Sequence, residues 1–237
     1  MTDDRHPASF QIRRRQSRRR RIRRGLLAAL VVVVAAGLVW LVGFSSVLGV
    51  NRVQVTGASL VGADQVTAAA AVTPGTPLAR VDSKALAARV TAAIPEVASV
   101  TVSRHWPNTL VIHVTERAIV YQIQLGGVYQ WVDATGTVFH SSDDAQPVPV
   151  ALVDTSDQQL MADVAAVVSA LPADLLPHVQ SVSAVTRDSI TLSLDDGRQV
   201  VWGSADQSAL KAQVLAPLLN VPGTVYNVSA PDNPAVH

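Results

Sequence analysis

The sequence predicts an α+β chain: a single N-terminal transmembrane helix, a first domain of order β-α-α-β-β, and a second, mixed α/β domain with antiparallel hairpins. Three observations lead to this prediction. No charged residue occurs between Arg24 and Asn51, strand-like and helix-like hydrophobic periods alternate after it, and two-residue turns interrupt strand-like sequence in the second half. The expected boundaries are a cytoplasmic Arg-rich tail at 1–24, the transmembrane helix at 25–49, domains at 50–117 and 118–230, and a flexible tail at 231–237.

The apolar segment from Leu26 to Leu48 is long enough to cross a bilayer. At about 1.5 Å per residue, a helix of this length spans a hydrocarbon core of roughly 30 Å. Nine arginines lie between Arg13 and Arg24, whereas Arg52 alone stands close to the far side. The positive-inside rule therefore predicts a single-pass type II protein of the cell membrane, with its N-terminus in the cytoplasm and both domains outside it.

The arginine-rich segment is open to other interpretations. Nucleic-acid binding is one, but helix orientation and attraction to anionic lipid explain arginines beside a span, so we expect lipid and no nucleic acid as the partner. A cleaved secretory signal is another, although its apolar region would hold about 7 to 15 residues. The Arg23-Arg24 pair is faintly similar to a twin-arginine export signal, but no cofactor motif follows it. The chain has no cysteine, which excludes disulfides and a lipoprotein anchor.

The first domain begins with a predicted strand around Val53 and Val55, which alternate with polar residues. Gly57 ends this strand. An Ala-rich helix is expected over residues 64–72, and the two prolines and the glycine of residues 73–77 break it.

A second helix is expected from Asp82 or Ser83, either of which can cap it, to Pro95, with apolar residues every four positions. Two further strands follow, over residues 98–102 and 110–114, with a reversal between them at residues 105–108.

The second domain is expected to be built on hairpins. Gly126-Gly127 and Asp196-Gly197 are turns of the type that needs positive φ, each between strand-like segments. Two helices are predicted from capping boxes, Ser156 with Gln159 and Ser204 with Gln207. Pro217 should break or kink the second of them.

Residues that could carry chemistry are few. The six histidines stand at no metal-ligand spacing, and the paired carboxylates Asp143-Asp144 and Asp195-Asp196 lie in turn-like sequence. Nucleophile, phosphate-loop and dinucleotide motifs do not occur in the sequence. We therefore expect no enzyme, no cofactor, no metal site and no small-molecule substrate. Exposed sheet edges, which can pair with another chain, are the expected binding feature.

Residues 53–117 resemble a POTRA domain, and VTVSRHWPNTLVIHVTER at residues 100–117 is similar to the end of that domain in the FtsQ/DivIB bacterial division proteins. Later motifs are similar to that family's β-domain: VDATGTVF at 132–139, LDDG at 194–197, Gly203 and Lys211. One departure is that the family usually has a proline shortly after the Glu116-Arg117 pair, where this chain continues Ala-Ile-Val.

This resemblance implies a scaffold of the bacterial divisome that is enriched at the division septum. Such a protein would bind FtsB/DivIC-like and FtsL-like subunits, and through them the septal peptidoglycan synthase pair FtsW and FtsI, without making or breaking a bond. One alternative is a POTRA-type chaperone or transport module of the cell envelope, which would have several POTRA repeats and a C-terminal barrel. Another is a membrane-tethered cell-wall hydrolase, which would need a catalytic constellation.

The strand predicted over Thr224–Ser229 is the candidate partner site. As the last predicted element before a polar tail it is expected at a sheet edge, and the resemblance implies that an FtsB-like partner binds there. Tyr226 is expected to point inward. The candidate partner-binding residues are Val225, Asn227 and Ser229 in one row and Tyr226 and Val228 in the other.

Two other features are candidate contact sites. Trp106, in the reversal at residues 105–108, is expected to fold back over the first domain's core, and Trp202 is interpreted in the same way. Glu116 and Arg117 are expected to orient the two domains rather than to touch a ligand.

Overall fold

The structure, a computed structural model, describes residues 23–37, 39–40 and 48–237. Residues 23–37 and 39–40 are helical. Within these described ranges, no helix is both long enough and apolar enough to cross a bilayer. Residues 1–22, 38 and 41–47 lie outside the described residues, and they contain most of the predicted tail and part of the predicted span.

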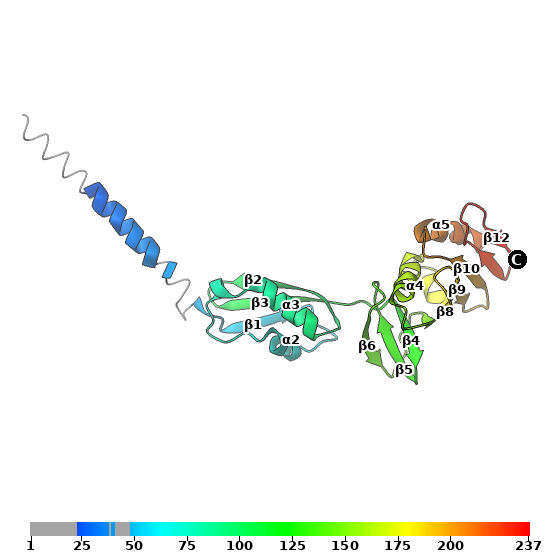
Figure 1. The fold of residues 1–237 in the computed structure, drawn as a ribbon, viewed down its shortest axis with the longest axis horizontal. Helices are drawn as coiled ribbons and strands as arrows, with labels where there is room; N and C mark the ends of the chain where they lie inside the picture. The colour runs from blue at the N-terminus through cyan, green and yellow to red at the C-terminus, as the bar shows by residue number, and fades with distance from the viewer. Residues whose placement is uncertain (1–22, 38, 41–47) are drawn as a thin grey trace, which may run out of the picture. The chain divides into compact units, whose positions relative to one another are not determined.

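The described chain forms two compact units (Figure 1). The first contains the described residues up to Thr56 together with 63–90 and 100–113, and the second contains 57–62, 91–99 and 114–237. The elements up to residue 116 are β1 (Arg52–Thr56), α2 (Ala63–Ala70), η2 (Leu78–Arg80), α3 (Ser83–Ala93), β2 (Val97–His105) and β3 (Thr109–Glu116). Apart from the short 3₁₀ helix η2, this is the predicted β-α-α-β-β order.

The three-stranded sheet has the order β1-β3-β2, with β1 parallel to β3. Alternate residues of β3, from Leu110 through Ile112, are fully buried, as the period-2 pattern predicts. Helix α3 begins after Asp82, whose Oδ1 accepts hydrogen bonds from the N–H groups of Lys84 and Ala85, both at 3.0 Å. Asp82 is therefore the N-cap that the sequence allowed.

Trp106 differs from its prediction. It lies in the turn between β2 and β3 with 52% of its surface exposed. The expectation that it folds back over the core is therefore wrong: His105, Trp106 and Pro107 are all exposed. Trp202, which was interpreted in the same way, is completely buried in β10.

Glu116, the last residue of β3, binds the loop that follows β1. Its Oε1 accepts hydrogen bonds from the N–H groups of Ser59 at 2.8 Å, Leu60 at 2.9 Å and Val61 at 2.9 Å. Its Oε2 accepts one from Ser59 Oγ at 2.6 Å. Desolvation by burial alone would raise the pKa of Glu116, but these hydrogen bonds outweigh it and lower the pKa from 4.5 to about 2.

This shift predicts a pH-dependent stability. Because the folded-state pKa of Glu116 lies below the unfolded-state value, its contribution is fully present above pH 4.5 and is lost as the pH falls towards 2. The unfolding midpoints of wild type and Glu116→Gln, measured in urea, should differ most at neutral pH and converge in that window. Asp174→Asn, which removes an exposed carboxylate, is the control. A Glu116→Gln difference that stays constant from pH 7 to pH 2 would contradict the assignment.

The second unit holds a nine-stranded mixed sheet of order β12-β11-β10-β9-β8-β7-β4-β5-β6. The pairs β4/β7, β7/β8 and β10/β11 are parallel, and the others are antiparallel. Its elements are β4 (Tyr121–Leu125), β5 (Val128–Val132), β6 (Val138–Ser142), β7 (Val150–Val153), α4 (Gln158–Ala170), η3 (Leu176–His178), β8 (Val179–Ala184), β9 (Ile190–Leu194), β10 (Gln199–Gly203), α5 (Ser208–Leu218), β11 (Val225–Asn227) and β12 (Ala235–Val236).

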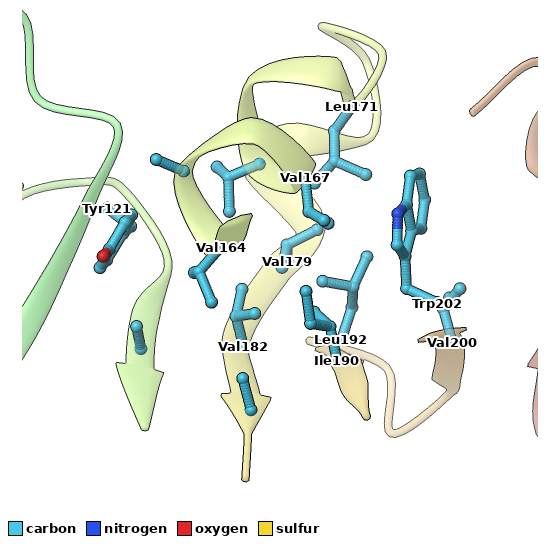
Figure 2. Packing of buried hydrophobic residues seen from close by; sticks show 14 of the residues in the cluster. Tyr121, Val164, Val167, Leu171, Val179, Val182, Ile190, Leu192, Val200 and Trp202 are labelled. Carbon is cyan, nitrogen blue, oxygen red and sulfur yellow. The ribbon is translucent and has the colours of Figure 1, made fainter. Parts of the chain in front are cut away.

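The core of this unit lies between α4, α5 and the sheet. Figure 2 shows Val164 and Val167 of α4 pointing toward Val179 and Val182 of β8. Both α4 valines are completely buried, and Trp202 of β10 belongs to the same cluster. The hairpin turns at residues 126–127 and 196–197 were predicted correctly.

Both predicted capping boxes are wrong in detail. The N-cap of α4 is Asp157, whose Oδ1 accepts hydrogen bonds from the N–H groups of Gln159 and Leu160, both at 3.0 Å. Helix α5 starts after Gln207, which has a φ of 53° and makes no side-chain cap. Pro217 lies within the last turn of α5 and does not end the helix before Leu218.

Candidate partner-binding edge

The candidate strand follows α5 and a turn that contains Gly223. Residues Val225–Asn227 form β11, which runs parallel to β10 with Tyr226 opposite Val200. Gln199 N donates to Thr224 O at 2.9 Å, and Val228 N donates to Val201 O at 3.0 Å. These bonds attach β11 to the sheet along one side.

The other side of β11 is covered by β12. Tyr226 lies opposite Val236 in an antiparallel pair, and His237 N donates to Val225 O at 2.9 Å. His237 O accepts from Thr224 N at 2.7 Å and Val225 N at 3.0 Å. The expectation that residues 224–229 lie at the edge is therefore wrong, because residues 235 and 236, placed in the flexible tail by the sequence, fold back as one more strand.

The side chains of β11 alternate between the core and the opposite face. Tyr226 and Val228 are 1% and 0% exposed, whereas Val225 and Asn227 are half-buried and Ser229 is exposed. The inward orientation expected for Tyr226 is confirmed, and its Oη donates to Val221 O at 2.8 Å. Tyr226 and Val228 thus pack into the core, whereas Val225, Asn227 and Ser229 face away from it.

Gly223 permits the close approach of β12. A Cβ at this position would lie 2.2 Å from Val236 Cγ1 and 3.1 Å from His237 O. A side chain there would therefore force the Val236 side chain to move and would crowd the backbone of His237. The turn residue and the edge strand therefore depend on each other.

The outward-facing groups at this edge belong to Val236. In an antiparallel pair, residues alternate between exchanging hydrogen bonds with the partner strand and facing away from it. Since His237 exchanges hydrogen bonds with Val225 and Val236, its neighbour in the chain, lies opposite Tyr226, the N–H and C=O of Val236 face away from β11. They can pair with an added strand.

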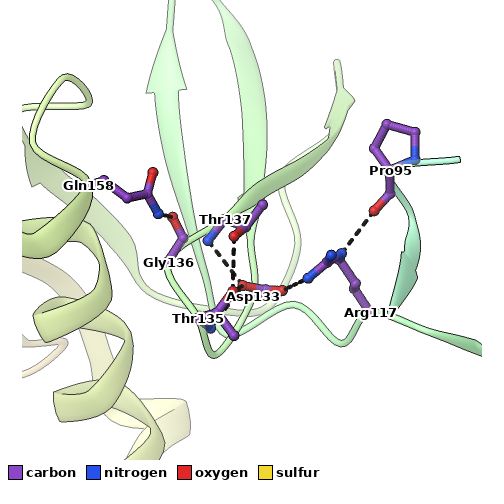
Figure 3. A network of polar contacts seen from close by, with 7 residues as sticks. All are labelled: Pro95, Arg117, Asp133, Thr135, Gly136, Thr137 and Gln158. Carbon is purple, nitrogen blue, oxygen red and sulfur yellow. Dashed lines mark hydrogen bonds and ion pairs between the residues drawn. The ribbon is translucent and has the colours of Figure 1, made fainter. Parts of the chain in front are cut away.

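Arg117 lies in a second polar site, within the second unit. Figure 3 shows its guanidinium between Pro95 O, which accepts from Nε at 2.9 Å, and Asp133, which is bound by Nη1. Asp133 is 5% exposed, and its Oδ1 also accepts from Thr135 N at 2.8 Å and Thr137 N at 3.0 Å. Burial alone would raise the pKa of Asp133, but these bonds lower it. The expectation that Glu116 and Arg117 orient the two domains stays a prediction.

Lys211 is buried, and its hydrogen-bond partner Ser204 lines a polar pocket of about 220 Å³. Its Nζ donates to Ser204 O at 2.8 Å, and burial lowers its pKa. The lysine therefore holds the loop between β10 and α5. Among the described residues, no group of three or more His, Asp or Glu could hold a metal ion.

Two family models match the chain in the order of its domains. Residues 48–117 match the FtsQ-type POTRA domain, and residues 121–228 match the C-terminal domain of cell division protein FtsQ/DivIB. Both matches agree with the resemblance that the sequence motifs carry. The three-stranded sheet is part of the POTRA domain, and the candidate edge lies in and just beyond the C-terminal domain.

Proteins named cell division protein FtsQ are similar to this chain over most of its length. The protein from Streptomyces venezuelae is 38% identical over 84% of this chain and 78% of its own. The protein from Mycolicibacterium smegmatis is 39% identical over 85% of this chain and 61% of its own. The extracytoplasmic domain of DivIB from Geobacillus stearothermophilus aligns with a TM-score of 0.37 at 18% identity, over 46% of this chain and 99% of that domain. The chain belongs to the FtsQ/DivIB family of bacterial cell division proteins.

Proposed function

We propose that this division protein is a membrane-anchored scaffold that works by binding and not by catalysis. The order of its parts carries the proposal: an FtsQ-type POTRA domain and an FtsQ/DivIB C-terminal domain follow an apolar segment flanked by nine arginines. In this proposal the segment from Leu26 to Leu48 crosses the cell membrane, the arginines meet anionic lipid in the cytoplasm, and both domains lie outside it.

The proposed partners are an FtsB/DivIC-like and an FtsL-like division subunit, and through them FtsW and FtsI. A partner strand would add to Val236 of β12, where main-chain groups face outward. Half-buried Val225 and Asn227 and exposed Ser229 would contribute side chains on the adjoining face. Affinity would come from main-chain hydrogen bonds and specificity from these side chains. Recruitment of septal cell-wall synthesis would follow from this binding.

Depletion of the protein tests the role in division directly. Cells that lose it should become filamentous or fail to separate, and a fluorescent fusion should gather at the division septum. A reporter that is active only outside the cytoplasm, fused after His237, should be active. Normal septation after depletion, with the fusion spread evenly over the membrane, would contradict the proposal.

A further inference from the structure

The chain directly after the apolar segment is attached to a loop of the first unit. Val50 N donates to Thr76 O at 2.9 Å, and Gly75 N donates to Val50 O at 2.9 Å. Gly49 forms a β-bridge with Pro77. The chain is therefore held in place from Gly49 onward, directly after the end of the apolar segment at Leu48.

The β2–β3 turn lies at the same end of the unit. Asn108 O, in this turn, accepts hydrogen bonds from Asn51 N at 2.9 Å and Arg52 N at 3.2 Å. Trp106 stands two residues before Asn108. The turn that contains the exposed tryptophan is thus hydrogen-bonded, through Asn108 O, to the first residues after the apolar segment.

Chain length limits how far this end can lie from the apolar segment. A residue spans at most about 3.6 Å of extended chain, so Asn51, three residues after Leu48, lies within roughly 11 Å of it. If the apolar segment crosses a bilayer, as the proposed function holds, the β2–β3 turn lies at the depth of the lipid headgroups or just above them.

The side chains of this turn suit such a position. Trp106 is 52% exposed, and Arg104 and His105 before it are exposed, as is Arg52. Tryptophan favours the membrane interface because it has an apolar ring and a polar N–H, and arginine is attracted to anionic headgroups. Arg104 Nη2 also donates to Val81 O at 2.7 Å, which fixes the position of this cation.

The charges of the two domains also favour a position of the first domain near the membrane. Residues 50–117 contain six Lys and Arg against four Asp and Glu, whereas residues 118–237 contain three against twelve. An anionic membrane surface would therefore attract the first domain and repel the second.

We propose that the β2–β3 turn is a membrane-contact site, in which Trp106 inserts among the headgroups and Arg52 and Arg104 bind anionic lipid. The contact rests on the proposed membrane anchor and adds a second point of attachment to it. A domain held at two points has less freedom to rotate on its anchor.

The test uses spin labels on the full chain, which has no cysteine of its own. His105→Cys reports on the turn, Gln65→Cys on the exposed first turn of α2, and Val33→Cys on the apolar segment. Each labelled protein is reconstituted alone in vesicles of phosphatidylcholine, with or without phosphatidylglycerol, and its collisions with a water-soluble nickel chelate are measured. The label at 105 should be several-fold less accessible than that at 65, more so with phosphatidylglycerol, and Trp106→Ser should reverse most of this protection.

The outcomes separate the contact from the anchor. Equal access at 105 and 65, with protection at 33, would overturn the membrane contact and leave the anchor in place. Access at 33 as high as at 65 would overturn both. Protection at 105 that appears in native membranes but not with the purified protein would also overturn the proposal, since a protein would then cover the turn.

Discussion

Replacement of Trp202 by alanine is expected to lower the free energy of unfolding of the second unit by about 3–5 kcal/mol. Trp202 is completely buried among residues of the largest core cluster, and its Nε1 donates a hydrogen bond to Ser208 Oγ at 3.1 Å. The substitution would remove the apolar contacts, leave a cavity and leave Ser208 without this partner. Since Ser208 opens α5, the effect should extend to that helix.

Chemical unfolding of the full chain in detergent measures this effect. Trp202→Phe, which keeps most of the volume but loses the hydrogen bond, should cost less than the alanine variant. Leu152→Ala is the surface control, because Leu152 is 63% exposed on its strand, and should change stability by no more than about 0.5 kcal/mol. A Trp202→Ala protein as stable as this control would show that the tryptophan is not part of the core.

The second large effect is expected from Val236→Pro, which should abolish capture of an FtsB-like ectodomain. Proline lacks the N–H that faces away from β11 and would be shared with an added strand. Val225 exchanges its hydrogen bonds with His237, and the next bonded position in an antiparallel pair is Asn227 with Ala235, so no bond between β11 and β12 is removed directly. The variant should therefore stay folded, and the core packing that its side chain loses is also lost in the alanine control.

Val236→Ala is the matched control, since it keeps the backbone N–H and shortens the side chain. It should retain binding. Asn227→Pro, placed within β11 and opposite Ala235, should both weaken the attachment of β12 and reduce capture. If Val236→Pro is folded and binds the partner with the affinity of the wild type, edge pairing at β12 is wrong.

Hydrophobic periodicity, together with capping and turn residues, was sufficient to predict the order of elements in the first domain. Residues such as Val53 and Leu110 alternate with polar neighbours over whole strands, and α3 lies between a capping aspartate and a proline. Local signals of this kind do not depend on distant contacts. The order of elements could therefore be predicted before any pairing was known.

The candidate edge could not be predicted to the same extent. Strand β12 has two residues, Ala235 and Val236, too few for any period to show. It forms because Gly223 leaves room for Val236 and because the backbone of Thr224 and Val225 binds His237, which are contacts across a turn. The parallel pairing of β7 with β8 could not be predicted either, because the hairpin turns in the sequence indicate only antiparallel neighbours.

The N-cap of α4 and the orientation of Trp106 could not be predicted for a different reason. Asp157 and Ser156 are both good N-caps, and the choice between them depends on where α4 meets the core. Trp106 stands in a turn whose sequence does not say on which side the ring lies. In both cases tertiary packing decides between local options that are nearly equal.

Crosslinking in dividing cells is the measurement that tests the central claim most directly. The chain has no cysteine, so Val236→Cys on β12 and Ser141→Cys on β6, the opposite edge of the sheet, each supply one site for a thiol crosslinker. We predict that Val236→Cys is joined to the FtsB-like subunit and that Ser141→Cys is not. A product formed at Ser141 alone, or at neither position while the cells divide normally, would contradict the account.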